Sequence, residues 1–225
     1  MNENSKSILN LLLTKSALKQ DISEDTQEAF KQFKEEVRKE LRELKTQVED
    51  DRIRLNFVEK SDFEFHVYIG SDVLVFQMHT NVFRLPDGHM LWKEKYLMEN
   101  NSNGYFGMIH IYNFLAESFI QNRYNDAGYL IGRMFVNHDK HFFVEGKGQL
   151  GFLFKDLEKG ELTNDVIRHI IQVSFAYALD FDLFMNREKL LIHVHAPINV
   201  NSKGHLKNRC TCLIRHTFSI RRTCS

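Results

Sequence analysis

Cysteine is absent from the first 209 residues of this 225-residue chain, and its three cysteines, Cys210, Cys212 and Cys224, lie near the C-terminus. Nothing in the preceding residues therefore argues for a disulfide framework or an oxidising compartment. No apolar run approaches the roughly 20 residues that a membrane-spanning helix needs. The apolar triplet at 11–13 is too short for the apolar core of a signal peptide. We therefore expect a cytoplasmic protein that has no membrane segment.

The chain has no formal net charge, because 30 basic residues balance 30 acidic ones. Residues 199–225 hold six of the basic residues and none of the acidic ones, so the first 198 residues carry a net charge of −6. Affinity for nucleic acid comes largely from neutralised phosphates, so this acidic body is a poor platform for it. A nucleic-acid binder that uses the basic residues 199–225 remains one hypothesis.

Proline and tryptophan are also scarce, with two and one residues, whereas phenylalanine occurs 19 times. This composition predicts long elements around a core of large rings. The 43% hydrophobic and 27% charged content is typical of a globular protein, and the length suffices for a sizeable core.

Two helices are expected before residue 50. Residues 5–19 predict a short helix, and Ser23 is placed to cap a longer one over 24–49. The longer helix has apolar residues at a mean spacing of 3.6, the period of a straight helix. These residues are Phe30, Phe33, Val37, Leu41, Leu44 and Val48. We expect this helix to dock on a globular surface, with helix pairing in a dimer as the alternative.

Residues 52–80 change to a period of two, which predicts strands. If Gly70-Ser71 is a two-residue turn, Phe65 faces Phe76 and one side of the hairpin is wholly apolar. A second hairpin is expected to join 82–85 to 90–96.

Further along, the pattern over 105–123 fits a helix, which its length favours, although 105–112 alone could be a strand. Strands are predicted over 129–136 and 141–145. A helix that is apolar nearly all round is expected over 164–181, capped by Thr163 or Asn164. A last strand is expected over 190–196.

The predicted fold class is α+β: a mostly antiparallel sheet built from hairpins, a long N-terminal amphipathic helix and a buried helix near 164–181. We divide the chain into an N-terminal helical segment (1–50), an α+β body (51–198) and a basic tail (199–225), which is either disordered or not native. The order of elements resembles the profilin-, longin- or roadblock-type layout. That resemblance is one of element order, and it implies ligand sensing or partner docking.

The stretch 141–151, HFFVEGKGQLG, carries two overlapping catalytic patterns. In the first, Glu145 and Lys147 form an E-x-K tripeptide at the end of a strand, which resembles the core of metal-dependent nucleases. The acid would bind Mg²⁺ or Mn²⁺, and the lysine would steady the attacking water or the phosphate. Asp126 and Glu117 are the candidates for the further carboxylates. The competing interpretation is a strand that ends in solvated charges.

The second pattern is the dinucleotide-binding fingerprint G-x-G-x-x-G at 146–151. It needs a parallel strand–helix–strand unit around it, and the neighbouring strands here predict hairpins instead. Turn glycines are the simpler interpretation, and we predict no cofactor.

His193 and His195 lie on one face of the last expected strand, a spacing that metal sites use. With 11 histidines in the chain, one such pair by chance is unsurprising. The cysteines and histidines of the tail match no zinc-finger or ribbon spacing.

The leading hypothesis is a non-catalytic, cytoplasmic binding or regulatory protein. Its contact with a protein partner, or with a second copy, would run through the 24–49 helix. The alternatives are a divalent-metal-dependent nuclease or phosphodiesterase centred on Glu145 and Lys147, and a nucleic-acid binder that uses the basic tail.

Overall fold

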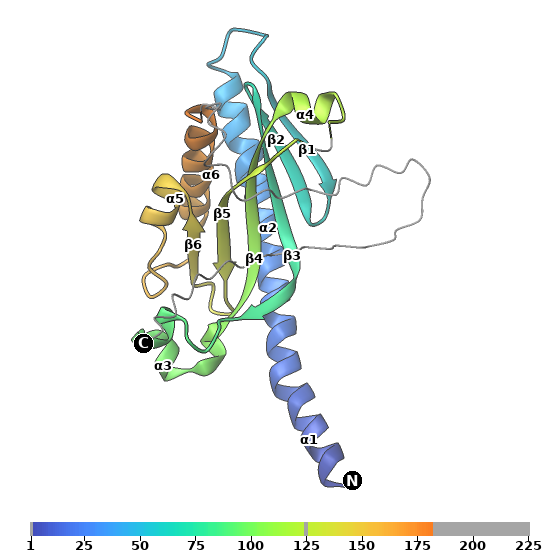
Figure 1. The fold of residues 1–225 in the computed structure, drawn as a ribbon, viewed down its shortest axis with the longest axis vertical. Coiled ribbons are helices and arrows are strands. Elements are labelled where there is room, and N and C mark those ends of the chain that lie inside the picture. Colours follow the sequence, from blue (N-terminus) through green and yellow to red (C-terminus); the bar gives the residue numbers. More distant parts are fainter. Residues whose placement is uncertain (1, 124–125, 182–225) are drawn as a thin grey trace, which may run out of the picture. The chain divides into compact units, whose positions relative to one another are not determined.

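The computed structural model describes residues 2–123 and 126–181, which form an α+β fold with one antiparallel sheet (Figure 1). The predicted strand at 190–196, the pair His193 and His195, and the tail 199–225 lie outside the described residues. No helix in the described part of the chain is long and apolar enough to cross a membrane.

The N-terminal helix is longer than expected. It runs through α1 (Glu3–Leu11), a π-helical turn η1 (Leu12–Ser16) and α2 (Ala17–Lys45). The predicted break before residue 24 was wrong, and Ser23 lies inside α2 rather than at its cap. The segment between 19 and 24 has no glycine or proline, so nothing there interrupts the helical backbone.

Within the described residues, six strands form the sheet in sequence order, each antiparallel to the next, as the predicted hairpins require. They are β1 (Leu55–Ser61), β2 (Glu64–Ile69), β3 (Asp72–Arg84), β4 (Tyr105–Leu115), β5 (Tyr129–Val136) and β6 (Phe142–Gly146). The register of the first predicted hairpin is confirmed, because Phe65 pairs with Phe76 and Ile69 pairs with Asp72. Gly70 in the connecting turn has φ +58°, a conformation that favours glycine.

Two predicted elements between β3 and β5 were wrong. The expected hairpin partner at 90–96 consists of a short 3₁₀ helix, η2 (Met90–Lys93), and α3 (Lys95–Glu99), followed by η3 (Asn101–Gly104). The expected helix over 105–123 is the strand β4 and one helical turn, α4 (Ala116–Ile120).

The C-terminal helix of the body, α6 (Asn164–Leu179), agrees with the prediction. Its cap is Thr163, whose Oγ1 accepts a hydrogen bond from Val166 N at 3.4 Å. Before it, α5 (Gly148–Leu153) follows β6 directly.

Both α2 and α6 pack on the same face of the sheet and against each other (Figure 1). The main core lies between these layers, and the rings of Phe30 and Phe33 from α2 meet those of Phe65 and Phe76. The apolar stripe of the predicted 24–49 helix is therefore covered by the chain's own sheet.

A smaller cluster lies on the opposite face, where the segment between β3 and β4 covers part of β4, β5 and β6. Its buried residues are Leu85, Leu97, Phe106, Met108, Phe135, Phe143 and Leu157.

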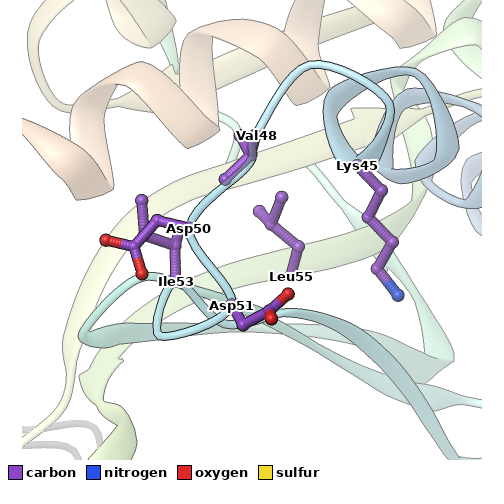
Figure 2. Close-up of a pocket in the computed structure, with 6 residues that line it drawn as sticks. All are labelled: Lys45, Val48, Asp50, Asp51, Ile53 and Leu55. Atoms are coloured by element: carbon purple, nitrogen blue, oxygen red, sulfur yellow. The ribbon is translucent and has the colours of Figure 1, made fainter.

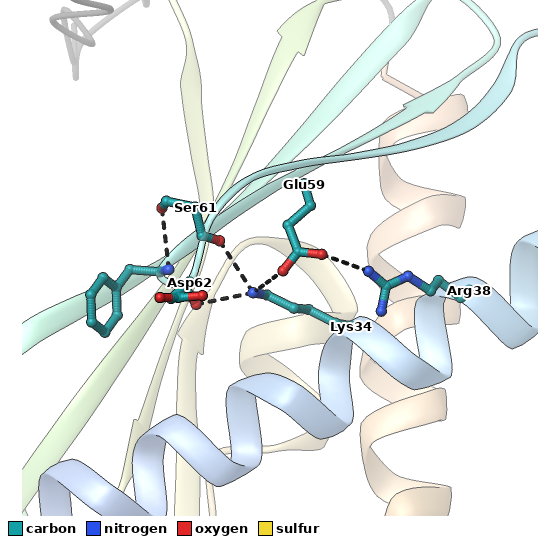
Figure 3. A network of polar contacts seen from close by, with 6 residues as sticks. Lys34, Arg38, Glu59, Ser61 and Asp62 are labelled. Atoms are coloured by element: carbon teal, nitrogen blue, oxygen red, sulfur yellow. Dashed lines mark hydrogen bonds and ion pairs between the residues drawn. The ribbon is translucent and has the colours of Figure 1, made fainter. Parts of the chain in front are cut away.

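A polar contact also ties α2 to the β1–β2 hairpin (Figure 3). Lys34, whose side chain is only 8% exposed, donates hydrogen bonds to Glu59 Oε1 at 2.7 Å and to the carbonyls of Ser61 and Asp62. Arg38 donates to the second oxygen of Glu59 at 2.7 Å. A buried ammonium needs this many acceptors, so the arrangement fixes the direction in which α2 crosses the sheet.

Candidate functional site

Glu145 lies in β6 on the face of the sheet that α2 and α6 leave free. Its Oε2 is 3.3 Å from Arg133 Nη2 on the neighbouring strand, and its side chain is 44% exposed. Lys147 is the residue before α5, and its backbone N–H donates to the carbonyl of Ile131 at 2.8 Å. The predicted acid is thus part of an ion pair on the sheet surface.

The two other carboxylates that the nuclease hypothesis requires, those of Glu117 and Asp126, form ion pairs with other residues. Glu117 pairs with Arg54 at 2.9 Å, and Asp126 pairs with Arg123 at 2.9 Å. Within residues 2–123 and 126–181, no three His, Cys, Asp or Glu side chains are close enough to hold one metal ion. The structure therefore does not bring Glu145, Asp126 and Glu117 together.

The glycines of the G-x-G-x-x-G pattern have a packing explanation. A Cβ on Gly151 would lie 2.3 Å from the carbonyl oxygen of Gly146, so only glycine lets α5 lie this close to β6. Gly148 has φ +54°, which also favours glycine. Because β6 is antiparallel to β5, the parallel strand–helix–strand setting of a dinucleotide site is lacking around the pattern.

The face of the sheet opposite α2 and α6 carries a row of polar side chains that the sequence analysis did not identify. Each member comes from a different strand and pairs in register with the next. The row is Glu64, Gln77, His110, Arg133 and Glu145. Its signal in the sequence is a polar residue in each strand on the side away from the apolar core, but the strand register is needed to align the five.

His110 is the member of this row with the most perturbed titration. Burial lowers the pKa of His110 to about 4, and the positive charge of Arg133 and the neighbouring His79 act in the same direction. Burial also lowers the pKa of His79. The row therefore has a neutral imidazole beside the Arg133–Glu145 ion pair at neutral pH. It offers hydrogen-bond donors and acceptors along one line.

We expect stability to fall between pH 6.5 and pH 4 because of His110. As the pH drops through this window, the unfolded chain binds a proton at His110 before the folded chain does. The free energy of unfolding therefore falls. At about 1.4 kcal/mol per pKa unit, discounted for partial exposure, the loss is about 2 kcal/mol. Urea titrations at several pH values measure this loss. Between pH 6.5 and pH 4 the free energy of unfolding of His110→Asn should fall by about 2 kcal/mol less than that of the native chain. Equal losses for the two proteins would mean that His110 is not the group responsible.

A cavity of about 280 Å³ lies where α2 ends and β1 begins (Figure 2). Its lining residues are Lys45, Val48, Asp50, Asp51, Ile53 and Leu55. Asp50 is already bound by the guanidinium of Arg52, with contacts of 2.6 to 3.1 Å. These hydrogen bonds lower the pKa of Asp50. The cavity is therefore lined by both charged and apolar side chains, and the carboxylate of Asp50 is already hydrogen-bonded to Arg52.

The most unusual surface is the start of the N-terminal helix, which extends past the strands (Figure 1). No side chain from Glu3 to Asp21 is buried, and Ile22 is the first that is. Five large apolar side chains in this projecting segment, residues 3–21, are 44–68% exposed. They are Ile8, Leu9, Leu11, Leu12 and Leu13. Single exposed apolar side chains are ordinary, but five within six positions are not.

Comparison of the chain with models of protein families, with curated proteins and with solved structures gives no match.

Proposed function

We propose that this chain is a non-catalytic, cytoplasmic binding protein that docks on a protein partner through its projecting segment. The observation that carries the proposal is the exposure of five large apolar side chains around α1 and η1. The apolar face of an amphipathic helix is normally packed on a core, and here no side chain from Glu3 to Asp21 is buried. The surface differs from the one expected from the sequence, because the stripe of 24–49 is already packed on the sheet.

The helical geometry of the segment supports the proposal. Helices shorter than about 12–15 residues are marginal in water when nothing packs on them. Residues 3–16 gain from continuity with α2 and from Asn2, whose side chain accepts a hydrogen bond from Ser5 N at 2.8 Å. A partner that covers the leucines would supply the packing energy that the segment lacks.

The double replacement Leu11→Glu with Leu12→Glu tests this function. In extracts of cells that express the chain, we expect the native protein to elute as an assembly larger than its own 26.6 kDa. The double variant should elute at the monomer mass, with partner affinity reduced at least about tenfold. Leucine and glutamate have similar helix propensities, and both leucines are more than half exposed, so the melting temperature should hardly change.

Ile120→Glu is the matched control. Ile120 is 51% exposed, close to the 53% of Leu11 and the 55% of Leu12, but it lies on α4. The control should keep the assembly. An assembly that survives the double replacement would overturn the proposed function.

A further inference from the structure

The two edges of the sheet differ in how their backbone groups are used. On β6, the N–H of Phe142 donates to the carbonyl of Gly160 at 2.9 Å. The N–H of Val144 likewise donates to the carbonyl of Phe154 at 2.6 Å. At the other edge, β1 has β2 as its one partner strand among the described residues (Figure 1). An open edge of this kind is a template for a further strand, and proteins usually cover it.

The register of β1 determines which of its backbone groups point outward. The N–H of Gly70 donates to the carbonyl of Arg54 at 2.8 Å, so every second residue counted from Arg54 exchanges hydrogen bonds with β2. The N–H and C=O groups of Leu55, Phe57 and Glu59 therefore point away from β2. Within residues 2–123 and 126–181, no backbone partner is bonded to these groups.

We propose that residues 190–195, which lie outside the described part of the chain, pair with this edge as a further strand of the sheet. Their sequence, LLIHVH, alternates with the period of a strand. One side of such a strand carries Leu190, Ile192 and Val194, and the other carries Leu191, His193 and His195. This contact is distinct from the one proposed for the projecting segment.

The alternation of 190–195 matches that of β1. Leu55 and Phe57 lie on the side of β1 that faces α2 and pack in the main core. Asn56 lies on the opposite face and is exposed. Because side chains of neighbouring strands share the faces of a sheet, the aliphatic side of 190–195 would extend the core. The two histidines would then lie on the face that already carries polar side chains.

The described chain ends close to the start of β1. Leu179 Cδ2, at the end of α6, lies 3.6 Å from the position that a Cβ on Gly70 would take, and Gly70 is bonded to Arg54, just before β1. The eight residues 182–189 can span about 26 Å at about 3.3 Å per residue. The seven residues of β1 extend over about 23 Å. The connection is therefore long enough to reach either end of the strand.

The cavity at the start of β1 leaves space for an apolar side chain beside this edge. Val48, Ile53 and Leu55 are its apolar walls, and Ile53 is 46% exposed. A side chain from 190–195 that enters the cavity would remove this apolar surface from water, which favours the pairing.

Amide hydrogen exchange of the purified full-length chain, measured residue by residue by NMR, tests the inference. In the native chain the outward N–H groups of Leu55, Phe57 and Glu59 should exchange within about tenfold of the rates of Asn56 and Val58, whose N–H groups point toward β2. On an uncovered edge the outward groups would exchange much faster than the inward ones.

The double replacement Ile192→Asp with Val194→Asp should uncover the edge, because it places two charges on the side that faces the core. The outward N–H groups of β1 should then gain at least about tenfold more in exchange rate than the inward ones. His193→Asp with His195→Asp is the matched control, since it makes the same change in the same segment on the opposite side. It should leave the rates within about threefold of the native values.

Three outcomes would overturn the inference. Fast exchange of the outward N–H groups in the native chain would mean that the edge is open. Slow exchange that survives Ile192→Asp with Val194→Asp would mean that another segment covers it. Slow exchange that is lost when the protein is diluted would assign the edge to a second copy of the chain.

Discussion

Phe65→Ala is expected to lower the free energy of unfolding by about 3–5 kcal/mol. Phe65 is fully buried, and its ring stacks on Phe76 with centroids 4.7 Å apart and planes 7° apart. It also contacts Phe30 on α2 and Phe57 on β1 at 5.2 Å each. Removing the ring would leave a cavity at the point where β1, β2, β3 and α2 meet, so several partners would lose contacts at once. Urea unfolding of the purified chain measures the change.

Phe63→Ala is the control for this prediction. Phe63 lies two residues earlier, before β2 begins, and is 36% exposed. Its replacement should change the free energy of unfolding by less than about 1 kcal/mol. A similar small effect of Phe65→Ala would mean that the stacked rings do not form the centre of the core.

The hairpin around Gly70 could be predicted from the sequence because two independent signals agree there. Alternation in residues 64–69 and 72–78 sets a period of two, and only the register that pairs Phe65 with Phe76 makes one face wholly apolar. The geometry of the turn and the hydrophobic pattern thus predict the same pairing of β2 with β3. The buried helix over 164–179 was equally clear, because its apolar residues extend nearly all round it.

The strand β4 was only the alternative to a helix in the sequence, because both of its faces are covered. Ile109 and Ile111 face α2 and the main core, whereas Phe106 and Met108 lie under the segment between β3 and β4. When both faces are buried the alternation that marks a strand disappears, and the remaining apolar spacing also fits a helix. The covering segment was itself misjudged, since the apolar residues of η2 and α3 pack on that second face rather than pair with a strand.

For the candidate binding surface the sequence predicted a helix over 5–19 that contains the leucine triplet at 11–13, but not that its apolar side chains are exposed. Whether a leucine is exposed depends on where the sheet ends beneath the helix, and local pattern does not contain that information. The polar row across the strands was hidden for a similar reason, since His110 and Arg133 become neighbours only through the pairing of β4 with β5. Glu145, in contrast, was identified as a residue of interest from its sequence, although its partner Arg133 was not.

Gly107→Ala is expected to lower the free energy of unfolding by about 3 kcal/mol, the upper end of the usual cost of overpacking. Gly107 lies in β4 beneath α2, and a Cβ there would be 1.9 Å from Thr26 Oγ1 and 2.8 Å from Thr26 Cβ. Thr26 cannot turn away easily, because its side chain is fully buried and its hydroxyl donates to the carbonyl of Ile22 at 2.6 Å. The helix must therefore move off the sheet. Thermal unfolding should show the loss as a large drop in melting temperature.

Two further variants separate this close contact from a general effect of removing a glycine. Gly88→Ala should change stability by less than about 0.5 kcal/mol, because a Cβ at Gly88 would have no atom within 4 Å. Thr26→Ala should recover part of the loss in the Gly107→Ala background, because it removes the hydroxyl and methyl groups nearest the new Cβ. A double variant less stable than Gly107→Ala alone would mean that the helix and the strand do not touch at this point. Thr26 follows Ile22, the first buried residue of α2, by about one turn, so this contact lies close to the point where the projecting segment begins.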